Sequence, residues 1–414
     1  SLVVMGGILV SVVLSSREGR VSWFAGFFIW CLDAGRLAPS PGGLLMMAIK
    51  RNGALPDQTL LQMIEDGLII GADEACIQPS SMDLPISLEI YRMPGSILPR
   101  ENERIRDFVA KFGIVVLPGT ILRRDDVYLC KLKVSLRLPS GICGKGSSKS
   151  STGRVDVRCR LLADYIQRYD FIPDGYSGDL WVEIVPKSFD VILHEGLRLN
   201  QLRFFYGDER FNQLEHQMAF DKFGLLRDRN GNRLPCEKHV SREGVIMTVD
   251  LSINPVVAYR SKRPHRALDL SSTSKVDSRD YFEVIERPTS GELVLKPGEF
   301  YLLGTRERIV IPPDYAAEMV QYDATIGNLF THFAGFFDPG FGWRNDGDNN
   351  IVGNVAVMEV EVHSSATVLR DGQNICVMAY ERMMRRPNQI YGAGINSNYG
   401  LQDAIKLAKF FDAA

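Results

Sequence analysis

The chain has 414 residues, of which 45% are apolar and 24% are charged, and its formal net charge is −2. These values are ordinary for a globular protein and exclude a disordered chain, a collagen-like repeat and a disulfide scaffold. The balanced charge argues against a broadly basic nucleic-acid coat, although a local basic pocket for a small polyanion remains open. The length predicts two or three domains, or one elaborated domain. Seven scattered cysteines without a Cys-x-x-Cys pair favour a reducing cytosol, so we expect a cytoplasmic protein.

The first 50 residues differ in composition from the rest of the chain. Two apolar stretches, 2–14 and 21–32, are each shorter than the roughly 20 residues that cross a bilayer. No positive charge precedes the first stretch, as a secretory signal would require. We therefore expect residues 1–50 to lie outside the fold, as an extension upstream of a start at Met47 or as a poorly packed arm. A membrane-attached tail is the alternative.

Beyond residue 50 the chain contains two copies of one unit. Four short segments recur in the same order and at nearly constant spacing: 78–84 and 245–251, 117–119 and 296–298, 182–184 and 358–360, and 194–200 and 370–375. The repeat is far longer than the roughly 20–50 residues of a solenoid unit, so each copy is a domain. We place the first domain at residues 51–208 and the second at residues 209–414, with the C-terminal tail in the second.

Each copy is predicted to begin with a short helix and to continue as many short strands. An apolar face at helical spacing follows Pro56, and residues 214–223 are its counterpart in the second copy. Alternating runs such as 127–134 and 180–185, separated by Pro-Gly and Asp-Gly turns, predict strands. We therefore expect a mainly β fold of two tandem barrel or sandwich domains, each with a short N-terminal helix.

The stretch 138–154 is the first segment suited to chemistry. It surrounds Lys149, Ser150, Ser151 and Arg154 with glycines and further hydroxyls. Glycines allow a ligand to approach the backbone, and hydroxyls and cations neutralise phosphate oxygens. Composition alone favours a flexible, solvated Ser/Gly loop, and a phosphate-binding segment is the alternative.

The second such segment is a turn followed by a strand with a carboxylate, and it occurs in both copies. The turn and strand hold Asp174 and Glu183 in the first copy, and Asp338 and Glu359 in the second. A buried Glu among apolar neighbours would have a raised pKa, which suits proton transfer near neutral pH. Strand alternation leaves a solvent-facing Glu183 as an equal alternative.

Taken together, these segments resemble the dCTP deaminases of the trimeric dUTPase superfamily. The resemblance covers nearly all of residues 56–414 as two tandem copies, and its specific part is Ser-Ser-x-x-Arg combined with the strand Glu. It implies a homo-oligomer, such as a trimer with sites between subunits, and Mg²⁺ held by the nucleotide triphosphate. It also implies no zinc, and the sequence lacks the His-x-Glu and Pro-Cys-x-x-Cys pattern of zinc deaminases. We expect neither a nucleic acid nor a membrane as a partner.

The resemblance also implies roles for residues of the first copy. Glu183 matches the catalytic glutamate of the family, and Ser150 and Arg154 match the pair that orients substrate and water. Lys149 stands where the family usually has Arg, and Ser151 is a further substrate-binding position. Asp174 matches another, although the Asp-Pro-Gly of the family is inverted here as Pro-Asp-Gly.

The second copy departs further from the family pattern. It keeps Asp338 and Glu359 as counterparts, but residues 322–328 contain neither a serine pair nor an arginine. We therefore expect the first copy to hold the fuller catalytic set. The tail residues Tyr391, Tyr399 and Gln402 resemble a family segment that closes over the nucleotide, with an exposed Gly/Asn loop as the alternative.

The function that the resemblance implies is hydrolytic, zinc-independent deamination of dCTP to dUTP and ammonia, which would supply dUTP for thymidylate synthesis. The alternative is a bifunctional enzyme that proceeds to dUMP and pyrophosphate, or a dUTPase. A catalytically inactive nucleotide-binding protein is a third class, suggested by the altered second copy.

Overall fold

The computed structural model describes residues 3–5, 8–10, 51–271, 275–321, 329–332, 335–344, 351–362, 365–392, 399–400 and 402–412. The chain divides into two units, Ser1–Ala38 and Pro39–Ala414. In the first unit, β1 (Val3–Met5) and β2 (Ile8–Val10) pair antiparallel. In the part of the chain that the structure describes, no helix has the length and apolar character needed to cross a membrane.

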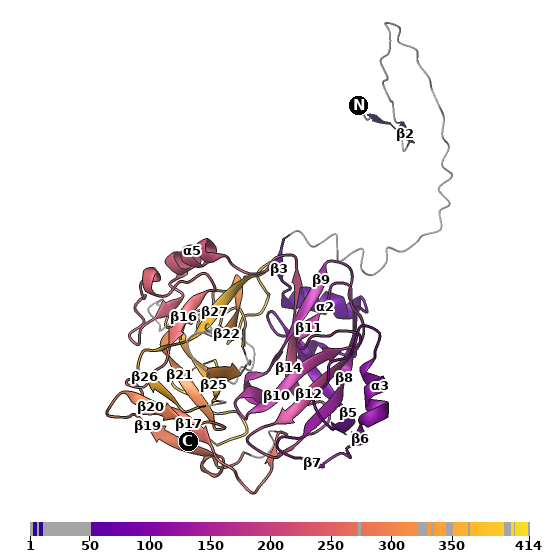
Figure 1. The fold of residues 1–414 in the computed structure, drawn as a ribbon. Helices are drawn as coiled ribbons and strands as arrows, with labels where there is room; N and C mark the ends of the chain where they lie inside the picture. The colour runs from indigo at the N-terminus through magenta and orange to yellow at the C-terminus, as the bar shows by residue number, and fades with distance from the viewer. Residues whose placement is uncertain are drawn as a thin grey trace. The chain divides into compact units, whose positions relative to one another are not determined.

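The second unit holds both copies (Figure 1). The elements of the first copy are β3 (Gly53–Ala54), α2 (Asp57–Glu65), β4 (Ile69–Ile70), η1 (Glu74–Cys76), β5 (Met82–Met93), α3 (Ile105–Phe112), β6 (Ile114–Val115), β7 (Ile121–Leu122), β8 (Val127–Arg137), β9 (Ile142–Ser148), α4 (Ser150–Gly153), β10 (Val157–Ala163), β11 (Phe171–Ile172), β12 (Ser177–Pro186), β13 (Val191–Ile192) and β14 (Arg198–Tyr206).

The elements of the second copy are α5 (Gln213–Phe223), β15 (Leu226–Arg227), η2 (Cys236–Lys238), β16 (Val245–Thr248), β17 (Val256–Ser261), β18 (Leu268–Asp269), η3 (Ser278–Asp280), β19 (Phe282–Glu286), β20 (Glu292–Leu295), β21 (Phe300–Ile309), β22 (Tyr315–Gln321), β23 (Leu329–His332), β24 (Phe336–Phe337), β25 (Asn354–Val362), β26 (Thr367–Arg370) and β27 (Asn374–Arg382). The prediction of a mainly β fold is confirmed.

Both predicted N-terminal helices are present. Helix α2 begins directly after Pro56, whose fixed φ suits a helix start, and buries Leu60 and Met63. The helix ends before Gly67, which takes a positive φ of 67°, so the apolar face is one turn shorter than the sequence pattern indicates. In α5, the side chain of Asn212 accepts a hydrogen bond from the backbone N–H of Glu215, a capping box that fixes the start of the helix.

The two copies repeat one sheet arrangement. In the first copy the strands follow the order β10-β12-β8-β5-β14-β9-β11. In the second copy β25 pairs with β21 as β12 pairs with β8, and β27 pairs with β22 as β14 pairs with β9. The glutamates that the sequence singles out, Glu183 and Glu359, therefore lie on corresponding strands, β12 and β25.

Segments of the second copy complete the hydrophobic core of the first. Strand β18 pairs in parallel with β13, and Val276 forms a β-bridge with Phe411 of the tail. Side chains of the second copy that pack in this shared core include Leu268, Leu270, Tyr281, Phe282, Phe300, Ile405, Phe410 and Phe411. The first copy therefore depends on the second for part of its buried apolar surface.

A fragment of residues 51–208 is accordingly expected not to fold, because each large apolar side chain that it loses contributes roughly 1.5–3 kcal/mol of burial free energy. Thermal unfolding followed by circular dichroism, with residues 51–414 as the matched control, measures this. Cooperative unfolding of the fragment at the temperature of the control would contradict the shared core.

Candidate active site

The Gly/Ser-rich stretch is a strand followed by a short helix. Residues 142–148 form β9, which pairs with β14 along its whole length. A Cβ atom at Gly146 would lie 2.8 Å from the Cβ of Leu161, so this glycine permits close packing of the neighbouring strand. The flexible, solvated loop that composition favours is therefore wrong for these residues. Lys149 caps α4, which carries Ser150 and Ser151, and Arg154 follows at its C-terminal end.

Arg154 is buried and is held by the C-terminal tail. Its side chain is 4% exposed, and its Nη1 donates a 2.6 Å hydrogen bond to the backbone carbonyl of Lys406. The guanidinium lies 3.7 Å from the centre of the Tyr399 ring, a cation–π contact. Both contacts fix the planar group, so Arg154 presents its remaining donors in one direction.

Glu359 of the second copy lies next to Arg154 of the first. On β25 it stands opposite Leu302 of β21 and His332 of β23, and it is 1% exposed. Burial raises the pKa of Glu359 to about 8, while the charge of Arg154 lowers it and that of Asp156 raises it. A carboxyl group with this pKa can both accept and donate a proton near neutral pH.

The tail brings Tyr399 and Gln402 to the same place. Tyr399 is 8% exposed and Gln402 is 1% exposed. Gln402 Nε2 donates to the carbonyl of Val355 on β25 at 2.6 Å, and the Val355 N–H donates back to the carbonyl of Gln402 at 2.9 Å. The alternative of an exposed Gly/Asn loop is therefore wrong for these two residues. Tyr391 lies apart from them, with its ring 5.5 Å from that of Phe341.

Arg154, Glu359 and the two tail residues contain four buried polar atoms that have no hydrogen-bond partner among the described residues. They are Arg154 Nε, Glu359 Oε2, Tyr399 OH and Gln402 Oε1. Buried polar groups in folded proteins are nearly always hydrogen-bonded, because an unmade bond costs about 1–3 kcal/mol. These four atoms lie in one place and have hydrogen-bonding capacity left for a polar ligand or water. We call Arg154, Glu359, Tyr399 and Gln402 the composite site.

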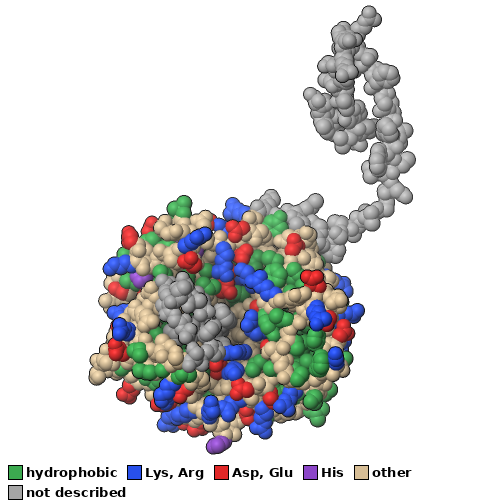
Figure 2. Space-filling model, viewed as in Figure 1, with side chains coloured by type: hydrophobic (Ala, Val, Ile, Leu, Met, Phe, Trp, Pro, Cys, Tyr) green, Lys and Arg blue, Asp and Glu red, His purple; other side chains and the backbone are tan. Residues whose placement is uncertain are grey.

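A cavity of about 740 Å³ opens between the copies beside this site. Its wall includes Ser148, Gly153 and Asp156, which flank the segment of Ser150 and Arg154. The volume lies within the range of small-molecule sites. The cationic side chains in its wall are Lys145, Arg158, Arg160, Arg168 and Arg210. Figure 2 shows Lys and Arg side chains bordering the hollowed region between the copies.

Glu183 is buried but lies in a different environment. It is 4% exposed, so the solvent-facing alternative is wrong, and burial raises its pKa as the sequence predicted. Its Oε1 accepts a hydrogen bond from Ser96 Oγ and its Oε2 accepts one from Tyr169 OH, both at 3.0 Å. Each oxygen thus has a donor within the first copy. Among the described residues, no hydrogen bond or ion pair joins Glu183 to Arg154.

The association of Glu183 with Arg154 therefore stays a prediction that no contact among the described residues of this chain supports. The charge of Arg154 acts instead on Glu359, because the first copy docks against β25 of the second. This docking is also visible where Arg158, four residues after Arg154, forms an ion pair with Glu361, two residues after Glu359.

The remaining predicted residues divide between the composite site and other places. Lys149 forms an ion pair with the buried Asp83, next to the two serines of α4. Asp174 is exposed and caps a turn by accepting from the N–H of Gly141, so it lies away from the composite site. Asp338 lies between the copies, with its Oδ1 accepting from Ser80 Oγ at 2.5 Å. Residues 322–328, the counterpart of Ser-Ser-x-x-Arg, lie outside the described residues.

Sequence reasoning missed Asp156. This residue takes a positive φ of 52°, which is uncommon for a side chain other than glycine, and it is 5% exposed. Burial raises its pKa to about 8, and Ser188 Oγ donates to its carboxylate at 2.6 Å. Its position two residues after Arg154 was the only feature of the sequence that could have marked Asp156 as a site residue. An Asp that follows a basic residue is too common on protein surfaces to stand out.

The pKa of Glu359 predicts a pH-dependent stability. The folded chain keeps this proton up to about pH 8, whereas an exposed Glu loses it near pH 4.5. Between these values the folded state binds more protons, so the free energy of unfolding falls as pH rises. From pH 5.5 to pH 7.5, the free energy of unfolding should fall by about 2 kcal/mol more in the wild type than in Glu359→Gln. Urea unfolding at both pH values measures this free energy. An equal fall in the two proteins would contradict a buried, protonated Glu359.

Comparisons with known proteins agree with this fold. The family model of the 2'-deoxycytidine 5'-triphosphate deaminase (DCD) N-terminal domain matches residues 51–208, and that of the DCD C-terminal domain matches residues 225–411. A solved structure of 2'-deoxycytidine 5'-triphosphate deaminase from Agrobacterium tumefaciens is 32% identical and covers 83% of this chain and 99% of that chain, with a TM-score of 0.75.

Two curated relatives match over shorter lengths. A dCTP deaminase (dUMP-forming) from Methanobrevibacter smithii is 26% identical over 159 residues, which are 36% of this chain and 78% of that protein. A dCTP deaminase from Haloarcula marismortui is 27% identical over 139 residues, which are 33% of this chain and 66% of that protein.

The tandem β fold and the likeness to the Agrobacterium enzyme define an enzyme of the dUTPase-like fold class. Because the two family models match most of the chain, one in each copy, the chain belongs to the dCTP deaminase family. The resemblance seen in the sequence, including its tandem form, is confirmed.

Proposed function

We propose that the chain deaminates dCTP hydrolytically at the composite site. The observation that carries the proposal is the composite site, where buried polar atoms of both copies have no hydrogen-bond partner among the described residues and the charge of Arg154 acts on Glu359. Family membership supplies the substrate class, since the Agrobacterium protein is titled a 2'-deoxycytidine 5'-triphosphate deaminase. In this assignment the second copy is not a catalytically inactive duplicate, because it supplies the residue that transfers protons.

The reaction adds water to cytosine C4 and releases ammonia. Glu359 accepts a proton from the water as its oxygen bonds to C4, and delivers this proton to N3. It then accepts the proton of the new C4 hydroxyl and delivers it to the amino group, which leaves as ammonia as the C4–N bond breaks and the C4 carbonyl forms. Arg154 and Ser150 hold the attacking oxygen, whose negative charge grows as the tetrahedral centre forms. The raised pKa of Glu359 suits a group that takes up and returns protons at neutral pH.

We propose further that the product is dUMP, with pyrophosphate released by a second hydrolysis. The Methanobrevibacter relative and a relative from Beutenbergia cavernae, 30% identical over 125 residues, are both named dUMP-forming. These names favour the bifunctional alternative over an enzyme that stops at dUTP. Measuring ammonia, pyrophosphate and nucleotide products from dCTP and Mg²⁺ tests it. Equal ammonia and pyrophosphate support dUMP formation, ammonia alone indicates dUTP, and neither product indicates a nucleotide-binding protein without this activity.

We propose that Mg²⁺ arrives with the nucleotide, bound through its triphosphate. Lys149, Ser150 and Ser151 are cationic and neutral groups that suit phosphate oxygens, and a nucleotide-bound Mg²⁺ usually keeps several waters. Prolonged treatment with a zinc-selective chelator is expected to leave kcat unchanged once Mg²⁺ is restored. Metal analysis and turnover measure this, and a requirement for added zinc would overturn it.

A further inference from the structure

Arg203 is a fully buried arginine at the contact between the two copies. Its side chain is 0% exposed, although it lies in the apolar run Leu202-Arg203-Phe204 of β14. Its guanidinium stacks on the ring of Phe336, with 4.3 Å to the ring centre. Burying an unpaired charge is costly, so each N–H of this group needs an acceptor.

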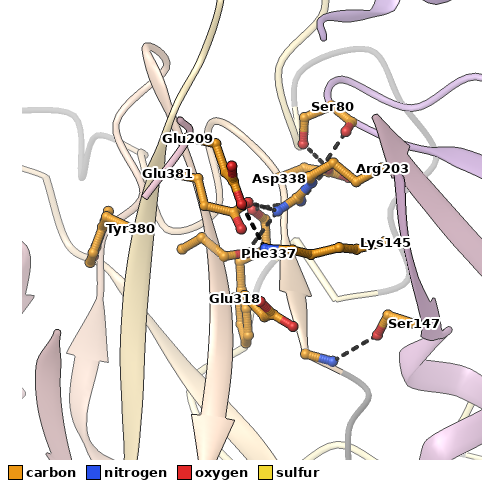
Figure 3. Close-up of polar contacts among 12 residues, drawn as sticks. Ser80, Lys145, Ser147, Arg203, Glu209, Glu318, Phe337, Asp338, Tyr380 and Glu381 are labelled. Carbon is orange, nitrogen blue, oxygen red and sulfur yellow. Dashed lines mark hydrogen bonds and ion pairs between the residues drawn. The ribbon is translucent and has the colours of Figure 1, made fainter. Parts of the chain in front are cut away.

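All five N–H donors of the guanidinium have acceptors (Figure 3). The acceptors are the backbone carbonyls of Ser80 at 3.2 Å, Ala317 at 3.0 Å and Phe337 at 3.2 Å, and the carboxylates of Asp338 at 3.2 Å and Glu381 at 2.7 Å. Only Ser80 belongs to the first copy. Arg203 therefore binds three separate strands or turns of the second copy at one point.

The same point is joined to the segment that carries Ser150 and Arg154. Arg203 stands opposite Lys145 in the pairing of β14 with β9. Two residues further along β9, Ser147 Oγ accepts a 3.3 Å hydrogen bond from the N–H of Gly335, just before β24. Strand β9 then leads through Lys149 into α4, so the position of the second copy and the position of α4 are set together.

We propose that Arg203 is a positioning residue for the deamination reaction: it fixes the second copy against β9 so that Glu359 meets Arg154 in the reactive geometry. This role rests on the proposed function. Arg203 contacts neither Arg154 nor Glu359 among the described residues, so it acts through the docking of the copies. A displacement of about 1 Å in an active site can lower turnover on the order of 100-fold.

Arg203→Lys tests the proposal because it keeps the positive charge and loses the planar fork of donors. The experiment measures kcat together with the number of dCTP molecules bound per chain and their Kd, the latter two by calorimetry. We expect one molecule bound per chain, Kd within about threefold of wild type, and kcat per bound nucleotide at least about tenfold lower. A variant that merely unfolds in part would lose binding sites and turnover in proportion, which leaves kcat per bound nucleotide unchanged.

The matched control is Arg260→Lys, since Arg260 also pairs with two acids, Glu283 and Glu299, but lies outside the composite site and the cavity wall. Its kcat should stay within about twofold of wild type. If Arg203→Lys is insoluble, Glu381→Gln takes its place, because it removes one charged acceptor and keeps the arginine. A fall of kcat per bound nucleotide of less than threefold in the variant tested overturns the proposal. Absence of ammonia from the wild type would instead remove the proposed function itself.

Discussion

Glu359→Gln is expected to lower kcat by about 10³-fold while leaving the Kd for dCTP within about tenfold. The amide keeps the shape of the side chain but cannot accept the proton of the attacking water. Glu359 is the carboxyl group that lies beside Arg154 and has an unpaired oxygen available to a ligand. Steady-state kinetics with ammonia detection and calorimetric binding measure the two quantities separately.

The matched control is Glu183→Gln, on the corresponding strand of the first copy. Both oxygens of Glu183 already accept hydrogen bonds, from Ser96 and Tyr169. We expect kcat of this variant to stay within about threefold of wild type, with any loss appearing as lower stability. An inactive Glu183→Gln together with an active Glu359→Gln would show that the first copy supplies the reacting carboxylate.

Arg154→Ala is expected to cost at least about 10²-fold in kcat, because it removes a fixed charge aimed at the oxygen that becomes negative. Lys149→Ala should cost about tenfold or less, mostly in KM, because Mg²⁺ and the neighbouring serines also contact a triphosphate. The side chain of Arg154 is held by the carbonyl of Lys406 and by Tyr399, whereas Lys149 is an ammonium paired with Asp83.

Thermal unfolding of both variants controls for stability, since losing the tail contact of Arg154 also loosens the fold. Arg154→Lys keeps the positive charge but lacks the planar guanidinium donors. We expect this variant to recover only a small part of the kcat that Arg154→Ala loses. Equal losses in Arg154→Ala and Lys149→Ala would show that the two cations serve the same phosphate groups.

Much of the fold followed from local sequence patterns. The alternation in 127–134 and 180–185 lies within β8 and β12, and 214–223 lies within α5. Such patterns report which face of an element is buried, which is a local property. Helix α3 was not anticipated, because its eight residues carry too short an apolar face to stand out among the strands.

The arrangement of the site could be predicted only in part. Ser150 and Arg154 were assigned from their motif, and the family tail indicated Tyr399 and Gln402. The meeting of Arg154 with Glu359 depends on how two folded copies dock, and no local pattern encodes that contact between distant segments. Strand alternation likewise could not show that the carboxylate of Glu183 accepts hydrogen bonds from hydroxyl groups of other segments.

Arg203 did carry a signal that the sequence analysis overlooked. A single arginine within an apolar strand is rare unless it is paired, because an isolated buried charge is strongly unfavourable. Its partners, Asp338 and Glu381, lie in the other copy, and only the structure identifies them.

The central claim is that one chain carries a complete site made of Arg154 from its first copy and Glu359 from its second. Mixing Arg154→Ala chains with Glu359→Gln chains tests it most directly, with the two variants carrying different tags so that mixed assemblies can be isolated and assayed. Each chain lacks one half of its own composite site, so the mixture should show no more activity than the sum of the separate variants. Activity well above that sum would show that Arg154 of one chain meets Glu359 of another, and would contradict a site contained within one chain.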